Sequence, residues 1–331
     1  MNKVIGIVVL VFVIAGLAAY GIYRKNSKAN ATENNAPRII CTTYPVYLFA
    51  REILKDTNGP QAELLLVPDT GCPHDYALTP SDLMKLAGDN ILLLKNGLGL
   101  DDNLCKDALH ANPAIKVVDT SVNAHAIPVE KHAHHTPECD KKGTCSHGHH
   151  HHGHNHHHHG AEFNPHLFAS PDTAAVVVAN ISAALQSFHP ECAEFYKKNT
   201  ESFLTELETL KKDFLAAGFT KKNIAVQHDV FAYLARMCGL KEAVSLHAES
   251  AMAPSPAEVA LLKKEIKEQE VAVLFSEPQY PAEFAKLISV EAGIPHHVLD
   301  SVTTGPEQPE PGHYIRQMRA NLETMKGVLT K

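Results

Sequence analysis

The sequence contains no tryptophan and no excess of positive charge. Its 331 residues include 30 Lys and Arg against 37 Asp and Glu, which gives a formal net charge of −7. Proteins that bind nucleic acids usually carry a basic patch and aromatic stacking platforms, so this composition argues against a nucleic-acid partner. The sequence also lacks an HExxH segment, in which a glutamate acts as general base beside two zinc-binding histidines. This absence argues against a zinc hydrolase of that kind.

The amino terminus carries one long apolar run. Residues 4–23 are uncharged and mostly apolar, Lys3 precedes them, and Arg24 and Lys25 follow. A run of this length is long for a signal-peptide core and sufficient for a helix that spans a membrane. We expect an uncleaved anchor, with a cleaved signal peptide as the alternative, and a polar tether that continues to residue 37. No cysteine follows the run closely, so a lipid anchor is not expected. The basic residues after the run would favour the orientation in which the rest of the chain stays on the cytoplasmic side, opposite to the one expected for an exported protein.

Cysteine is odd in number and histidine is unusually abundant, with 7 and 23 residues. An exported protein can form disulfides, but seven cysteines leave at least one thiol that is free or bound to a ligand. The spacings of the cysteines do not fix a pairing.

Short apolar runs alternate with helical patterns in two parts of the chain. Buried strands are predicted in the first part at 38–42, 63–67, 90–94 and 115–118, and in the second at 223–227, 271–275 and 296–299. Strands that alternate with helices at this spacing predict βαβ units and parallel sheets. The fold class expected is therefore α/β.

A long helix is predicted between these two parts. Residues 191–217 carry apolar side chains on one face and charges elsewhere. At about 1.5 Å per residue this helix would span roughly 40 Å, which is longer than a single lobe needs. We therefore predict two lobes, 38–190 and 218–331, with parallel sheets joined by one long rigid helix.

A histidine-rich segment interrupts the first predicted lobe. Residues 124–161 show no apolar periodicity and contain 14 of the 23 histidines, so they are expected to form a disordered loop. Tracts of this composition usually bind metal, here at modest affinity because the chain must lose entropy to chelate. A solubilising or pH-responsive insert is the alternative. The predicted auxiliary ligands are His149, His150, His151, His152, His154, His156, His157, His158 and His159.

Three histidines and one aspartate occupy the same kind of position. His74, His166 and His228 each precede a predicted helix, and Asp300 follows a predicted strand. Ligands bind at the carboxyl ends of strands in open α/β sheets, so these side chains could converge on a cleft between the two lobes. Three imidazole nitrogens and a carboxylate oxygen suit Zn²⁺. From spacing alone, ordinary structural roles for these residues remain the alternative.

Several acidic residues lie near the same predicted strand or loop ends. Asp75 and Asp229 could accept hydrogen bonds from the neighbouring histidines, although a helix cap is the preferred interpretation for Asp229. Glu249 and Glu277 are interpreted as ion-pair partners or helix caps within the second lobe.

Four short motifs occur in a characteristic order. They are Pro73-His74-Asp75-Tyr76 with Thr79-Pro80-Ser81-Asp82, then Asn96-Gly97-Leu98-Gly99-Leu100, then Asn164-Pro165-His166, then His228-Asp229 with Phe231, Tyr233 and Leu234. Together they resemble the cluster A-I solute-binding proteins of zinc and manganese ABC importers, and among these the zinc-binding, ZnuA-like type. The resemblance covers about residues 38–331.

The resemblance implies two α/β lobes joined by a long rigid helix, with a metal ion in the cleft between them. It makes His74, His166 and His228 the imidazole ligands and places Asp300 at the usual carboxylate position, where some relatives use water. Manganese-preferring relatives typically have glutamate at the third position. Because His228 stands there in this chain, Zn²⁺ is expected as the transported ligand and Mn²⁺ is less favoured.

The function expected is that of a monomeric receptor, not an enzyme. It would capture zinc at the periplasmic or extracellular face of the cytoplasmic membrane. Its partner would be the membrane permease subunit of an ABC importer with its cytoplasmic ATPase. The alternatives are a manganese receptor of the same family, a histidine-rich zinc buffer or metallochaperone without a transport role, and a zinc hydrolase with three histidines and an open water position.

Overall fold

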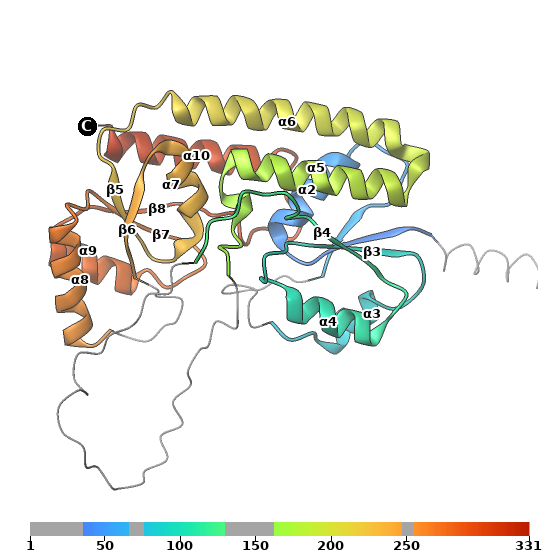
Figure 1. The fold of residues 1–331 in the computed structure, drawn as a ribbon, viewed down its shortest axis with the longest axis horizontal. Coiled ribbons are helices and arrows are strands. Elements are labelled where there is room, and N and C mark those ends of the chain that lie inside the picture. Colours follow the sequence, from blue (N-terminus) through green and yellow to red (C-terminus); the bar gives the residue numbers. More distant parts are fainter. Residues whose placement is uncertain (1–35, 66–75, 130–161, 247–253, 331) are drawn as a thin grey trace, which may run out of the picture.

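Two parallel sheets, one in each half of the chain, form the framework of the protein (Figure 1). The computed structural model describes residues 36–65, 76–129, 162–246 and 254–330. The first sheet has the order β2-β1-β3-β4 and the second the order β6-β5-β7-β8. The strands are β1 (Arg38–Cys41), β2 (Ala62–Leu64), β3 (Ile91–Lys95), β4 (Lys116–Asp119), β5 (Asn223–Val226), β6 (Lys241–Ser245), β7 (Leu274–Ser276) and β8 (His296–Val298). The predicted α/β class with parallel sheets is confirmed.

Helices cover both faces of each sheet. The first sheet carries α2 (Tyr44–Leu54), α3 (Pro80–Lys85), α4 (Asp102–Ala111) and α5 (Pro171–Phe188), and with it they form the first lobe. The second sheet carries α7 (Ala232–Cys238), α8 (Pro256–Glu268), α9 (Glu283–Ala292) and α10 (His313–Leu329), and with it they form the second lobe.

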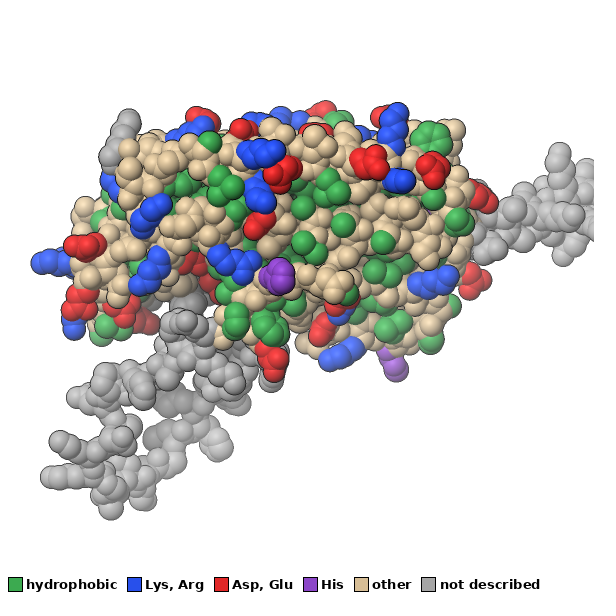
Figure 2. Space-filling view, turned by 45° about the horizontal axis from the view of Figure 1, so that its top comes forward, with side chains coloured by type: hydrophobic (Ala, Val, Ile, Leu, Met, Phe, Trp, Pro, Cys, Tyr) green, Lys and Arg blue, Asp and Glu red, His purple; other side chains and the backbone are tan. Residues whose placement is uncertain are grey.

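The long helix α6 (Ala193–Leu215) runs across the top of both lobes in Figure 1. It packs against α2 and α5 of the first lobe and against α7 and α10 of the second. On its outer side, Asp213 pairs with Arg319 of α10 at 2.8 Å. Acidic and basic side chains are interspersed on the face of the molecule that Figure 2 shows.

The central strands of both sheets send alternate side chains into different cores. In β1, Ile39 and Cys41 face one core and Ile40 faces another. In β5, Val226 faces the same core as Ile39 and Cys41, and Ala225 faces a third core. Successive side chains of a strand point to opposite faces, so each sheet is buried on both sides. This burial explains why the strands read as continuous apolar runs in the sequence.

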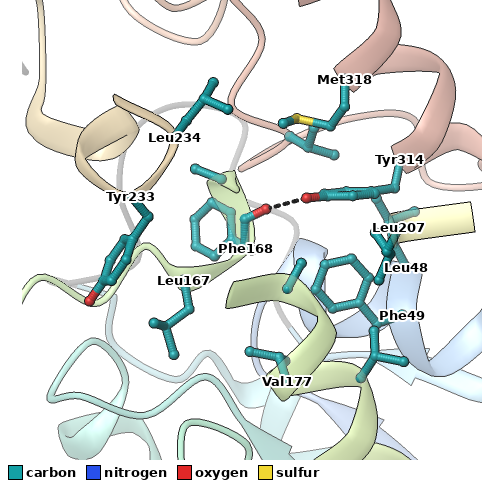
Figure 3. Close-up of a cluster of buried hydrophobic side chains, with 14 of the residues drawn as sticks. Leu48, Phe49, Leu167, Phe168, Val177, Leu207, Tyr233, Leu234, Tyr314 and Met318 are labelled. Atoms are coloured by element: carbon teal, nitrogen blue, oxygen red, sulfur yellow. Dashed lines mark hydrogen bonds between the residues drawn. The ribbon is translucent and has the colours of Figure 1, made fainter. Parts of the chain in front are cut away.

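One apolar core extends through both lobes beneath α6. It includes Phe49 of α2, Phe203 of α6 and Tyr314 of α10. The ring centroids of Phe49 and Tyr314 are 4.9 Å apart, and the interplanar angle is 76°. The Tyr314 hydroxyl donates a hydrogen bond of 2.7 Å to the carbonyl of Phe168, which Figure 3 shows as a dashed line. The two smaller cores lie on the outer faces, under α3 and α4 in the first lobe and under α8 and α9 in the second.

Two helices begin with a reciprocal capping box. Thr79 and Asp82 form a reciprocal capping box at α3, and Ser255 and Glu258 form another at α8. Each pair satisfies two backbone N–H groups that the first helical turn leaves without a partner.

Two features differ from the expectations. The sequence patterns did not indicate strand β6, which lies at the edge of the second sheet. Residues 124–129, which were predicted to belong to a disordered segment, are part of the described fold: Pro128 pairs with Phe163 in an antiparallel bridge, and the Val129 N–H donates to the carbonyl of Glu162 at 3.0 Å.

Two expectations concern residues that the structure does not describe fully. The predicted anchor at 4–23 lies outside the described residues, and among those that are described no helix is long and apolar enough to cross a membrane. Four cysteines lie within the described part and are free thiols: Cys41, Cys105, Cys192 and Cys238.

Replacement of Tyr314 by phenylalanine should destabilise the protein by about 1–3 kcal/mol, because it leaves the buried Phe168 carbonyl without this donor. Urea unfolding of the metal-free protein measures the effect. Tyr47→Phe is the matched control, since the Tyr47 hydroxyl makes only two long contacts of 3.4 Å. Equal losses of stability in the two variants would contradict the importance of the Tyr314 bond.

Candidate metal site

Two residues of the second lobe follow the central strands of its sheet. His228 comes shortly after β5, and Glu277 comes directly after β7. These strands are neighbours, but the chain visits β6 on the far side of β5 before it returns to β7. Such a reversal of strand order opens a crevice at the carboxyl ends of the strands, where α/β proteins bind their ligands. The topology thus places both side chains where a ligand is expected.

The first lobe contributes His166 from the segment that precedes α5. Asn96, which follows β3, donates from its side-chain amide to the carbonyl of Pro165 at 3.0 Å. Asn164 accepts a hydrogen bond of 2.9 Å from the backbone N–H of His166. Both asparagines are almost completely buried, with 4% and 3% exposure. The Asn164-Pro165-His166 segment is therefore attached to the carboxyl edge of the first sheet.

The two predicted ligands from the two lobes lie side by side. The imidazole rings of His166 and His228 have centroids 4.8 Å apart and an interplanar angle of 82°. The exposure of these residues is 1% and 4%. A purely structural role is unfavourable for two buried imidazoles in contact, because each ring nitrogen needs a polar partner.

Polar side chains hold the Nδ1 atom of each ring. Glu277 Oε1 lies 3.2 Å from Nδ1 of His228, and Asn164 Oδ1 lies 2.9 Å from Nδ1 of His166. A carboxylate or amide oxygen accepts hydrogen bonds, so Nδ1 of each ring is the donor in these contacts, and a neutral ring then has its lone pair on Nε2. This arrangement is the usual one for metal-binding histidines.

Three described residues could together hold an ion. His166, His228 and Asp229 offer ligand atoms that all lie within 4.8 Å of one another. Asp229 Oδ1 lies 3.4 Å from Nε2 of His228, and its side chain is 37% exposed. Nitrogen ligands combined with carboxylate oxygen are the set that Zn²⁺ prefers among common biological divalent ions.

The other predicted ligands are placed differently. His74 and the histidines from His149 to His159 lie outside the described residues. Asp300 follows β8, but it is not one of the three residues grouped around the imidazoles. Its carboxylate accepts hydrogen bonds from Val302 N at 2.8 Å and Gln317 Nε2 at 2.6 Å. The roles of His74 and Asp300 as ligands stay predictions.

The acidic residues close to His228 were only partly understood from the sequence. The predicted helix cap at Asp229 is wrong, since no side chain caps η4 (Asp229–Phe231) or α7. Glu277 was expected to form an ion pair or a helix cap within the second lobe, whereas its carboxylate lies 3.2 Å from the ring of His228, a predicted metal ligand, so it lies at the candidate site. The signal that could have located it was its place after a central strand of the sheet.

A further carboxyl group, that of Glu242, lies close enough to His228 to interact with it electrostatically. The pKa of Glu242 is raised to about 8, mainly by burial and also by the negative charges of Asp229 and Glu277, while His228 acts in the opposite direction. Its Oε1 atom has no hydrogen-bond partner among the described residues. Carboxyl groups on several sides of His228 make this region favourable for a cation.

Comparison with known proteins identifies the family of the chain. A family model described as the zinc-uptake complex component A, periplasmic, matches residues 39–328. This match covers most of the chain. The chain belongs to this ZnuA family.

Individual relatives are between a quarter and a third identical to the chain over the aligned residues. The zinc-binding protein AdcA of Streptococcus pyogenes serotype M3 is 29% identical over 300 residues, which cover 87% of this chain and 55% of AdcA. The chain thus spans about half the length of this relative. The high-affinity zinc uptake system protein ZnuA of Bacillus subtilis is 27% identical over 327 residues and is covered to 96%, as is this chain.

Solved structures share the fold. The Zn(II)-bound ZnuA-like domain of Streptococcus pneumoniae AdcA superimposes with a TM-score of 0.68 at 24% identity, and the match covers 89% of this chain and 100% of that domain. The two-lobed arrangement is therefore that of the ZnuA family.

Replacement of Glu277 by glutamine should lower zinc affinity by roughly 10- to 100-fold, because a neutral amide supports the Nδ1–H tautomer of His228 less well than a carboxylate does. Titration against a zinc chelator measures the change. Glu291→Gln is the control, since Glu291 forms an exposed pair with Lys263 in the same lobe. An affinity for zinc equal to that of the wild type would exclude Glu277 from the site.

Replacement of Glu242 by glutamine should change how stability depends on pH. With a folded-state pKa of about 8, Glu242 holds a proton that the unfolded chain releases near its ordinary value of about 4. Between these values the folded state binds more protons, so the free energy of unfolding falls as pH rises. Urea unfolding of the metal-free protein should show a smaller fall from about pH 5 to about pH 8 in Glu242→Gln. A fall as large as in the wild type and in Glu291→Gln would contradict the raised pKa.

Proposed function

We propose that this protein is an extracytoplasmic receptor that captures Zn²⁺ and delivers it to the membrane permease of an ABC importer with its cytoplasmic ATPase. The observation that carries the proposal is the meeting of His166 and His228, two buried imidazoles from separate lobes, with ring centroids 4.8 Å apart. Membership of the ZnuA family supports the same function. The ion is cargo, so the site must bind it and release it without chemical change.

The proposed ligands are His74, His166, His228 and a carboxylate. Asp300 is the predicted carboxylate, and Asp229, which belongs to the group around the two imidazoles, is the candidate that the geometry adds. His166 and His228 supply neutral nitrogen ligands through Nε2, since Nδ1 of each ring faces an acceptor oxygen. Nitrogen-rich ligation favours zinc over manganese, so a manganese receptor is the less favoured alternative.

The location of the protein is part of the proposal. Residues 4–23 would anchor a monomer at the outer face of the cytoplasmic membrane, with residues 38–190 and 218–331 as its two lobes and the segment 191–217 as the link. Among the proteins similar to this chain is the zinc-binding lipoprotein AdcA of Streptococcus pneumoniae. The histidine tract would collect zinc near the site.

The proposal is tested by chelator-competition titration of the metal-free protein with Zn²⁺ and with Mn²⁺. We expect one tight zinc site and far weaker manganese binding. His166→Ala and His228→Ala should each weaken zinc binding by roughly 100-fold or more, because each removes a ligand rather than its support. His110→Ala is the control, since His110 is an exposed residue of α4.

A deletion separates the two candidate locations of the tight site. Removal of residues 130–161 should leave tight zinc binding intact, because the Val129–Glu162 hydrogen bond already brings the flanking residues together. Loss of all tight binding in this variant would make the histidine tract the main site. The receptor function would then give way to a metal buffer without a transport role.

A further inference from the structure

Asn164 uses every polar group it possesses. Its backbone N–H donates to the carbonyl of Ile127 at 2.7 Å, and its backbone carbonyl accepts from the Tyr233 hydroxyl at 2.6 Å. Its side-chain oxygen accepts from the backbone of His166, and its Nδ2 donates to the carbonyl of Asp229 at 2.8 Å. An asparagine that is 3% exposed and bonded on all sides has one orientation only.

The bonds of Asn164 connect segments from both lobes. Ile127 and His166 belong to the first lobe, whereas Asp229 and Tyr233 follow β5 in the second. Tyr233 strengthens the connection, since its hydroxyl also accepts from the backbone N–H of Ile127 at 3.1 Å. In Figure 3 this hydroxyl points away from the labelled side chains of the shared core. Asn164 is thus a direct link between the two segments that carry His166 and His228.

The orientation of the Asn164 amide follows from partners whose roles are fixed. The backbone N–H of His166 can only donate, so it must face the amide oxygen, and the backbone carbonyl of Asp229 can only accept, so it must face the amide nitrogen. A rotated amide would place donor against donor and acceptor against acceptor. The usual ambiguity between the oxygen and nitrogen of an asparagine does not arise here.

The fixed amide in turn determines the tautomer of His166. The same oxygen lies 2.9 Å from Nδ1 of the imidazole, and because an amide oxygen accepts hydrogen bonds, Nδ1 must carry the proton. In the neutral ring the lone pair is then on Nε2. We infer that Asn164 is a positioning residue: its amide, held in one orientation by the Asp229 carbonyl of the second lobe, presents the oxygen that sets the metal-binding tautomer of His166 in the first lobe.

This inference rests on the proposed function for its purpose, but its physical content concerns the metal-free protein. The segment that carries His166 would be prepared for the ion by its contact with the second lobe, before the ion arrives. A site prepared in this way avoids a rearrangement of protons and side chains at the moment of binding.

Two substitutions at position 164 separate the possible roles. Asn164→Ala removes both the acceptor for His166 and the donor to Asp229. Asn164→Asp has almost the same shape, retains an acceptor for Nδ1 of His166 and lacks the donor to Asp229. Asn199→Ala is the matched control, because the Asn199 amide also binds two backbone carbonyls, those of Ile53 and Lys55, and contacts no proposed ligand.

The first measurement is proton–nitrogen NMR of the full chain, metal-free, with ¹⁵N in the histidine rings. A buried and hydrogen-bonded Nδ1–H of His166 exchanges slowly with water and gives a downfield resonance, which is assigned by its absence in His166→Gln. We expect this resonance in the wild type, Asn199→Ala and Asn164→Asp, and its loss in Asn164→Ala. The corresponding resonance of His228, which Glu277 supports, should persist in all four and shows that the variants are folded.

The second measurement is zinc affinity by chelator competition on the same proteins. Asn164→Ala should bind zinc roughly 10- to 100-fold more weakly than the wild type, and Asn164→Asp should recover most of that loss. Asn199→Ala should bind as the wild type does, even where its melting temperature is lower.

Three results would overturn the inference. They are an Nδ1–H resonance of His166 that persists in Asn164→Ala, a wild-type His166 protonated on Nε2, and an Asn164→Asp that keeps the resonance but binds zinc as weakly as Asn164→Ala. A wild-type protein with the expected resonance and no tight zinc site would instead contradict the proposed function, while the tautomer result would stand.

Discussion

The apolar core that both lobes share is the constraint on which the rest of the structure depends. Each sheet must bury two faces, and one face of each is buried against the same set of helices beneath α6. Phe49, Phe203 and Tyr314 come from three helices and meet in this core. The position of one sheet relative to the other is therefore fixed by packing, and the carboxyl edges of the two sheets are held at a constant separation.

Polar contacts also join the two lobes, in addition to the shared core. The loop that follows Asp300 crosses to α2, where the hydroxyls of Tyr44 and Tyr47 donate to its carbonyls and Glu52 accepts from the N–H of Gly312 at 2.6 Å. Gly305 lies so close to Tyr44 that an added Cβ would be 2.5 Å from the hydroxyl oxygen. Movement of one lobe against the other would have to break these bonds as well as expose the shared core. A two-lobed protein built in this way favours small local adjustments over a wide opening.

Sequence patterns predicted the fold, and they singled out two histidines that the structure brings together, because both depend on local signals. Apolar periodicity located most strands, and His166 and His228 stand next to recognisable helix starts. Glu277 was harder, because its pairing with His228 depends on the strand order β6-β5-β7-β8, which periodicity does not reveal. Asn164 was quoted as part of a motif, but its link to Asp229 joins residues 65 positions apart. Strand β6 begins with two charged residues, Lys241 and Glu242, so it lacks the continuous apolar run that predicts a buried strand.

The pairing of Val129 with Glu162 has a consequence for how this chain can vary. Two residues after Glu162 stands Asn164, whose N–H donates to the carbonyl of Ile127. These hydrogen bonds join residues on either side of positions 130–161 and involve none of them. A change in the length or composition of that stretch would therefore leave in place the contacts that hold the segment carrying His166.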